Sequence, residues 1–313
     1  MILLCVFFAA DRRGDMAYGI PEQYKIKSAE LSELKDAVSI EWTGCAGFRL
    51  KHKGTTLLID PFVTRPRMAG MVAMPLKCNE QLCAEVFPEA DYILVGHSHY
   101  DHLLDVPEVA SKTRALVLGS PSTASVCLGA GMPDEKVKVV ETFIPIMCGP
   151  FKVTFVPGVH GKAVLGRIPF PGQISGRPKQ PMRASHYRAG GVYGLLIEIG
   201  ALKLYHIGSA DLIDDETAKV GKVNALFTCL AGRQDTPNYI ARLNSRLQPD
   251  YIIPHHYDDF FQPFKFGNNL MSGVDIDSFF SEVKAVSPGA RIVMPEYFQA
   301  MTFDPKTGKL VEG

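Results

Sequence analysis

The spacing of hydrophobic residues predicts strands in the first half of this chain. Short alternating or apolar runs at 37–42, 47–52 and 55–61 are separated by turns that contain glycine, which is typical of antiparallel strands. Apolar, β-branched runs at 91–97 and 114–120 flank a helical stretch at 105–113. That order predicts a unit in which two parallel strands are joined by a helix.

The same order, strands followed by helices, recurs in the second half. The predicted strands lie at 136–141, 151–160, 193–200, 202–208, 225–231, 250–258 and 291–298, and the predicted helices at 236–248 and 275–287. Two strand-rich halves, each followed by helices, fit two sheets packed face to face with helices outside. The expected fold class is therefore α/β, a four-layer αββα sandwich, with residues 36–313 as one domain.

Composition and charge exclude several classes of protein. The chain has 313 residues, 46% of them hydrophobic, and its 33 basic residues balance 33 acidic ones. A neutral chain has no overall field that attracts nucleic acid, so no nucleic-acid partner is expected. No run reaches the roughly 20 apolar residues of a transmembrane segment. Seven scattered cysteines without a CxxC pair indicate reduced thiols and a cytoplasmic protein.

The N-terminal segment, residues 1–35, is treated separately from the domain. Its apolar run at 2–10 has the length of a signal peptide, but no basic region precedes it and the sequence DRRGD follows. Two interpretations stay open. The segment is either signal-like, which would make the protein exported or anchored, or the start is mis-assigned and Met16 is the first residue.

Four ligand-type side chains crowd into residues 97–102, directly after the apolar run that ends at Gly96. They form the pattern H-x-H-x-D-H and are His97, His99, Asp101 and His102. Imidazole nitrogens and carboxylates bind transition metals, but one short loop cannot enclose an ion. Further candidates end other apolar runs, where a sheet edge would collect them: His160, Asp211, His255 and His256.

These motifs resemble those of the metallo-β-lactamase superfamily. The similarity covers nearly all of residues 36–300 through LLIDP, GHSHYDH, VPGVHG, YHIGSAD and IIPHHYDDF, and is greatest to the branch with ascorbate-6-phosphate lactonase and N-acyl phosphatidylethanolamine phospholipase D. The resemblance implies that one metal is held by His97, His99 and His160, and a second by Asp101, His102 and His256. It also implies that Asp60 braces the segment 97–102, called the metal loop here. His255, adjacent to His256, would face the core or contact the metal ligands from outside, because consecutive strand residues face opposite sides.

One position departs from that family pattern. Where the family has an aspartate that bridges the two metals after a glycine, Gly208 is followed by Ser209, and the next carboxylate is Asp211. Three outcomes stay open: a bulge brings Asp211 into the bridge, the second metal binds weakly, or only one metal binds. Asp258 and Asp259 offer further carboxylates, for which solvated side chains are the ordinary interpretation.

This ligand set predicts a metal-dependent hydrolase. Metal-bound hydroxide would be the nucleophile, and Asp101 would act as the catalytic residue that orients it or takes its proton. Zn²⁺, as one or two ions, is the expected cofactor, and Mn²⁺ is compatible with the oxygen ligands. The chain has no GxSxG elbow and no glycine-rich phosphate-binding motif that would indicate other chemistry.

The loop at 161–191, called the basic insertion here, contains six basic residues and no acidic one. Long loops at a metal site are usually functional, so an anionic small-molecule substrate with a lactone, ester or phosphodiester bond is expected. The candidate contacts are Arg167, Arg183, His186 and Tyr187. The alternative is a solvated loop folded away from the site. A mononuclear iron oxygenase, a nuclease of the same fold, a non-catalytic metal-binding protein and a homo-oligomer also stay open.

Overall fold

The computed structural model describes residues 18–26, 36–264 and 269–311. Met16 and most of the N-terminal segment 1–35 lie outside these ranges, so both interpretations of that segment stay predictions. Within the described ranges, no helix combines the length and the apolar character that crossing a bilayer requires.

The first sheet has, among the described residues, seven strands in the order β14-β1-β2-β3-β4-β5-β6. Their bounds are β1 (Val38–Gly44), β2 (Gly47–His52), β3 (Thr55–Ile59), β4 (Tyr92–Leu94), β5 (Leu116–Gly119), β6 (Val137–Val139) and β14 (Ala300–Phe303). β1, β2 and β3 pair antiparallel, and β4 pairs parallel with β5, as the sequence predicts. β4 also pairs parallel with β3, and β5 with β6. The sequence pattern did not predict β14, which pairs antiparallel with β1.

The second sheet has the order β13-β12-β11-β10-β9-β8-β7. Its strands are β7 (Ile146–Cys148), β8 (Phe151–Pro157), β9 (Tyr193–Ile199), β10 (Leu202–Ile207), β11 (Ala225–Cys229), β12 (Tyr251–His255) and β13 (Arg291–Ile292). Pairing is antiparallel from β7 to β10 and parallel from β10 to β13. The predicted strand at 291–298 is therefore much shorter than expected.

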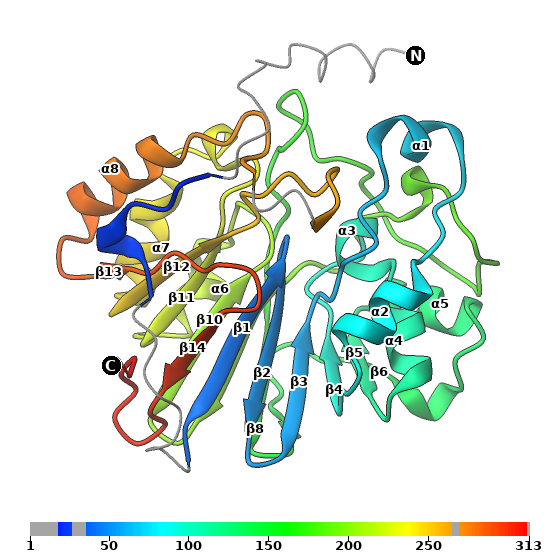
Figure 1. Ribbon diagram of the computed structural model, residues 1–313, viewed down its shortest axis with the longest axis horizontal. Helices are drawn as coiled ribbons and strands as arrows, with labels where there is room; N and C mark the ends of the chain where they lie inside the picture. Colours follow the sequence, from blue (N-terminus) through cyan, green and yellow to red (C-terminus); the bar gives the residue numbers. More distant parts are fainter. Residues whose placement is uncertain (1–17, 27–35, 265–268, 312–313) are drawn as a thin grey trace.

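Alternation along β3 separates two hydrophobic cores. Leu57 and Ile59 belong to the core between the sheets, whereas Leu58 points to a second core beneath the helices. Figure 1 shows α2 (Glu80–Val86), α4 (Val106–Lys112) and α5 (Pro121–Gly129) on the side of the first sheet, and α7 (Tyr239–Leu247) and α8 (Ile276–Val286) on the side of the second. The predicted four-layer αββα sandwich is confirmed.

Three of these helices begin at side-chain caps. The side chains of Asn79, Ser120 and Asp275 accept hydrogen bonds from backbone N–H groups at the starts of α2, α5 and α8. Each such cap contributes about 1 kcal/mol of stability. Shorter helices are α1 (Met68–Ala73), α3 (Tyr100–Leu103) and α6 (Asp214–Ala218). The metal loop includes most of α3, which is the next helix or strand after β4.

Strand direction determines where the candidate ligands gather. β1, β3 and β4 run in the same direction in the first sheet, and β8, β10 and β12 do so in the second. The segments after β4, β8, β10 and β12 contain the ligand candidates that the sequence singled out, except His255, which is the last residue of β12. The fold therefore collects residues that are far apart in sequence at the C-terminal ends of strands from both sheets.

Candidate metal centre

Three histidines from two strand ends converge in a first cluster. His97 and His99 follow β4, and His160 follows β8. The Nδ1 atom of His99 lies 3.1 Å from Nε2 of His97 and 3.1 Å from Nε2 of His160. All three side chains are buried. The structure thus brings together the three residues that the resemblance places on one metal.

The arrangement of these nitrogens fits a bound cation. His160 Nδ1 lies 2.7 Å from the carbonyl oxygen of Gly161, so Nδ1 carries the proton and Nε2 is a bare acceptor. If His99 Nδ1 carries a proton, it can donate a good hydrogen bond to only one of its two neighbouring nitrogens. A cation would instead accept a lone pair from each of the three rings. Tetrahedral zinc separates its nitrogen ligands by roughly 3.4 Å, close to the spacing found here.

Burial keeps the first cluster uncharged. It lowers the pKa of His160 to about 3, with a further contribution from His99. Burial also lowers the pKa of His99 to about 4 and holds that of His97 well below its ordinary value. Neutral imidazole is the form that binds metal, so the three rings need no proton removed near neutral pH.

A second cluster lies beside the first and combines three kinds of donor atom. Asp101 lies on α3, His256 follows β12, and Cys45 occupies the turn between β1 and β2. His256 Nε2 is 3.2 Å from Asp101 Oδ2 and 3.3 Å from Cys45 Sγ, and the sulfur is 3.9 Å from the same carboxylate oxygen. The placement of Asp101 and His256 together agrees with the resemblance. Cys45 does not appear among the residues predicted from the sequence.

His102 lies between the two clusters and is braced by Asp60. Its Nε2 is 3.6 Å from Asp101 Oδ2, and its ring centroid is 3.7 Å from that of His97. Its Nδ1 lies 2.8 Å from Asp60 Oδ2, while Asp60 Oδ1 accepts from the N–H of Gly96 at 2.7 Å. Asp60 therefore has the contacts that the resemblance implies, and it orients the His102 ring.

The charges of this second group depend on one another. Burial opposes ionisation of Asp101, but His102 and His256 hold the pKa of its carboxyl below the usual range. Burial likewise opposes a charge on His102, but the carboxylates of Asp60 and Asp101 raise its pKa. The two neighbouring histidines thus stabilise the Asp101 carboxylate, and a bound metal ion would take over that role.

Three residues of the centre have a left-handed backbone conformation. The φ angles are +51° for Cys45, +41° for Asp60 and +56° for His256. This region is unfavourable for residues with a Cβ atom and is concentrated at functional sites. The backbone N–H of His256 donates to the carbonyl oxygen of Cys45 at 2.9 Å, so two of these residues hold each other in place.

The strand end after β10 supplies no ligand to either cluster. Ser209 Oγ accepts a hydrogen bond from the N–H of Gly161 at 3.0 Å. The Asp211 carboxylate accepts from its neighbour Leu212 N–H at 2.8 Å and forms an ion pair with Arg242 at 3.1 Å. Asp211 therefore lies outside both clusters, because no bulge turns it inward and a cation already neutralises it, and its assignment as a metal ligand stays a prediction.

The residues around His256 also differ from expectation. Asp258 is fully buried, pairs with Arg65 and accepts from the N–H of Cys45 at 3.0 Å, so it is neither solvated nor a ligand. Asp259 accepts from Phe261 N–H at 3.0 Å. His255 is fully buried and stacks on His206 with ring centroids 4.7 Å apart, which confirms that it faces the core.

The cysteines are less scattered in space than in sequence. Cys78 and Cys83 have sulfur atoms 3.3 Å apart, close to the Asp105 carboxylate. Asp105 already accepts from the N–H groups of Val63 and Thr64, so this third group serves to brace a loop. Cys45 was missed because it was counted with the scattered thiols. The signal that would have found it is its position directly after β1.

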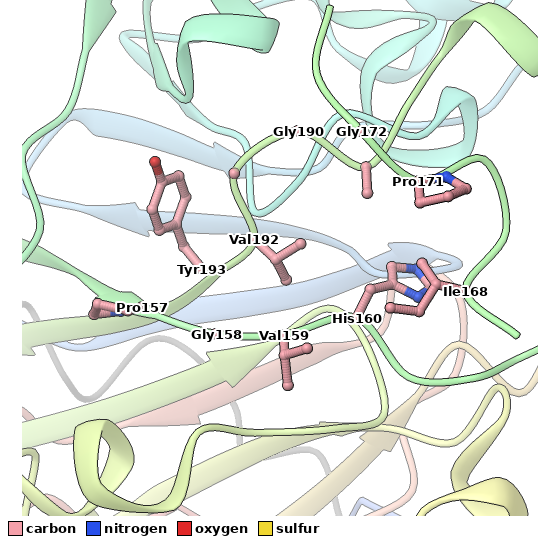
Figure 2. A pocket seen from close by; sticks show the side chains of 12 residues that line it. Pro157, Gly158, Val159, His160, Ile168, Pro171, Gly172, Gly190, Val192 and Tyr193 are labelled. Atoms are coloured by element: carbon pink, nitrogen blue, oxygen red, sulfur yellow. The ribbon is translucent and has the colours of Figure 1, made fainter.

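A cavity of about 400 Å³ opens beside His160. Figure 2 shows Ile168, Pro171 and Val192 around it, together with His160 itself. The basic insertion supplies half of the wall, residues 168, 171–172 and 189–191. The ring of Phe170, also in the insertion, has its centroid 6.4 Å from that of the His99 ring. This part of the insertion therefore lies against the site, whereas its basic side chains Arg167 and Arg183 are exposed.

The four predicted substrate contacts fall into two groups. Arg167, Arg183 and His186 are exposed. Tyr187 is almost completely buried in the second core, and its hydroxyl donates to Gln180 Oε1 at 3.2 Å. Its ring anchors the insertion to the helical layer, so the structure does not place Tyr187 beside the other three, and its assignment as a substrate contact stays a prediction.

Residues 39–256 match the family model described as the beta-lactamase superfamily domain. The match covers more than half of the chain, so the protein belongs to this superfamily, and the resemblance seen in the sequence is confirmed. Among curated proteins, the chain is 27% identical over 243 residues to a UPF0173 metal-dependent hydrolase of Anaeromyxobacter sp. (strain K), which covers 74% of this chain and 79% of that protein. It is 28% identical to the Thermodesulfovibrio yellowstonii relative of the same description, with 72% and 80% covered.

Solved structures agree on the fold. A metallo hydrolase from Ignicoccus hospitalis superposes with a TM-score of 0.56 at 16% identity, covering 86% of this chain and 99% of that one. A diiron β-hydroxylase from Streptomyces venezuelae gives 0.54 at 18% identity, covering 86% of this chain and 54% of that one. At such low identity these similarities establish the metallo-β-lactamase fold, which hosts more than one chemistry.

Proposed function

We propose that this protein, a metal-dependent hydrolase by family, cleaves a lactone, ester or phosphodiester bond in a small molecule at the centre formed by the two clusters. The observation that carries the proposal is the convergence of three buried, neutral ring nitrogens, those of His97, His99 and His160, beside the Asp101 carboxylate. A zinc ion bound to such donors supplies an activated water and polarises the bond that breaks.

Each residue of the centre then has a distinct role. His97, His99 and His160 hold one ion, while Asp101, His102 and His256 serve the other. Asp101 is also the catalytic residue. Its Oδ2 lies 3.2 Å from His256 Nε2 and 3.6 Å from His102 Nε2, and these contacts fix its direction. A carboxylate held there orients the attacking water and accepts its proton.

The cavity and the basic insertion suggest which substrates fit. The cavity beside His160 is lined mainly by apolar side chains and glycine, so it suits a compact apolar group next to the scissile bond. Arg167, Arg183 and His186 are exposed on the same insertion and would attract a negatively charged group from solvent. The proposed substrate therefore has an apolar part in the cavity and an anionic part outside it.

The proposal is tested with metal-free protein and a panel of a lactone, an aryl ester and a phosphodiester. Chelation should abolish turnover of at least one substrate, and added zinc should restore it. His99→Ala should stay inactive with zinc. His52→Ala is the matched control, because His52 is also buried but contacts Phe151 and Ala37 away from the centre. Full turnover by thoroughly chelated protein would contradict the proposal.

The same preparation separates hydrolysis from the oxygenase alternative. Metal analysis gives the identity of the bound ion, and an oxygen electrode shows whether oxygen is consumed. Hydrolysis with zinc and without oxygen uptake supports the proposal. Iron in the purified protein together with substrate-dependent oxygen consumption would favour an oxygenase instead.

A further inference from the structure

Cys45 is the residue of the centre that neither the sequence pattern nor the family resemblance explains. It follows the last residue of β1 and is completely buried. Its sulfur lies 3.3 Å from His256 Nε2 and 3.9 Å from Asp101 Oδ2, and those two atoms lie 3.2 Å apart. The sulfur, nitrogen and oxygen atoms thus form a triangle and lie close enough together to bind one ion.

The edges of this triangle match those around a tetrahedral ion. Zinc bonds of about 2.3 Å to sulfur and about 2.0 to 2.2 Å to nitrogen and oxygen place such donors roughly 3.4 to 3.6 Å apart. The distances found, 3.2, 3.3 and 3.9 Å, scatter about those values. The three side chains need little movement to bind one ion together.

Cys45 is fixed in this position by its own backbone. Its N–H donates to both oxygens of Asp258, at 3.0 and 3.1 Å. Its carbonyl oxygen accepts from Trp42 Nε1 and from the N–H of His256, each at 2.9 Å. These contacts hold a left-handed conformation, φ +51°, that a cysteine rarely adopts. A conformation imposed so strongly indicates that the direction of the side chain matters.

Cys45 also compensates for a missing charge. At the strand end where the family pattern has an aspartate, Ser209 binds the Gly161 N–H and Asp211 pairs with Arg242. Asp101 is then the only carboxylate in the second cluster of described residues that could hold an ion. A thiolate supplies a second negative charge at that point, from a different strand.

We propose that Cys45 is a thiolate ligand of the second metal ion, together with Asp101 and His256. On binding, the thiol proton is released to solvent and the sulfur forms the metal bond. Because thiolate is a soft ligand, this site should prefer zinc to manganese or magnesium. The inference rests on the proposed function, since it assumes that metal occupies the centre.

The test is a cobalt titration of metal-free protein, followed by absorption spectroscopy. A cobalt–thiolate bond gives an intense near-ultraviolet charge-transfer band that nitrogen and oxygen ligands do not give. Wild-type protein should bind two equivalents and develop the band with one of them. Cys45→Ser should lose the band and at least about 100-fold in zinc affinity at that site, more than a mutated outer contact usually costs. The control Cys127→Ser removes a buried thiol from α5 and should keep the band.

The outcomes separate the two proposals. Two bound cobalt ions in wild-type protein without the band, or a band that persists in Cys45→Ser, would overturn the Cys45 assignment alone. Wild-type protein that binds no cobalt would overturn the proposed function as well. If Cys45→Ser does not fold, the wild-type titration still decides, and X-ray absorption of the zinc protein shows directly whether sulfur is bound.

Discussion

The buried ion pair between Arg65 and Asp258 holds the carboxylate that binds the Cys45 N–H, so removing Arg65 should destabilise the protein. Both side chains are buried, with exposures of 1% and 0%. The Arg65 guanidinium also lies 3.8 Å from the centroid of the Phe264 ring. The change Arg65→Met keeps an apolar chain of similar length against Phe264 and leaves the Asp258 carboxylate without its cation.

The size of the effect follows from burial and from the remaining contacts. Removing one partner of a buried pair costs about 3 to 5 kcal/mol, because the other charge stays desolvated. Asp258 keeps two kinds of donor, the Cys45 N–H and the Tyr297 hydroxyl at 2.6 Å, so the lower value applies. A loss of about 3 kcal/mol in a chain of this length lowers Tm by about 6 °C.

The assay is urea unfolding and calorimetry of the metal-free protein. Arg114→Met is the matched control, since Arg114 pairs with Asp91 but its side chain is 77% exposed, and it should change stability little. Cobalt binding should weaken more at the second cluster than at the first in Arg65→Met, because Asp258 positions the Cys45 backbone. A stability loss as small as that of Arg114→Met would show that the buried ion pair contributes little to folding.

Three further predictions concern acid, charge and the cavity. Metal-free protein should lose stability as the pH falls from about 6.5 toward 4, by about 1.4 kcal/mol per pH unit for each histidine. The reason is that folding lowers the pKa of His99 to about 4 and that of His160 to about 3, so protonation favours the unfolded chain. A urea midpoint that stays constant between pH 7 and 5 would contradict this prediction. Arg167→Glu or Arg183→Glu should lower kcat/KM for an anionic substrate more than for a neutral ester, and this loss should become smaller at high salt. Equal losses for both substrates would show that the insertion shapes the pocket without recognising an anion. Val192→Phe should narrow the cavity and raise KM for esters with bulky apolar groups, and an unchanged KM would place the substrate elsewhere.

Local patterns in the sequence were sufficient to predict the layers of the fold. The alternation at 55–59 places Leu57 and Leu58 in different cores, so each face of the first sheet must be covered by another layer. β14 was missed because its pairing with β1 joins residues about 260 positions apart, for example Val38 with Phe303. No local pattern reports such a partner, and α5 was missed because its apolar residues show little helical periodicity.

The candidate site was predicted best where ligands share one loop or end a strand. His97, His99 and His160 meet as expected, because the ends of β4 and β8 lie together. Asp211 does not join them, because it pairs with Arg242, a partner on α7 that sequence spacing does not reveal. Cys45 was not predicted because its neighbours Asp101 and His256 are distant in the sequence. Only the folded chain shows what lies beside a buried thiol.

The most direct test of the central claim is anomalous diffraction at the zinc edge from crystals of zinc-loaded protein. We expect one peak among the ring nitrogens of His97, His99 and His160. A second peak is expected beside Asp101 and His256. No peak at the three histidines, or zinc bound only at the separate group of Cys78, Cys83 and Asp105, would contradict the assignment of the metal centre.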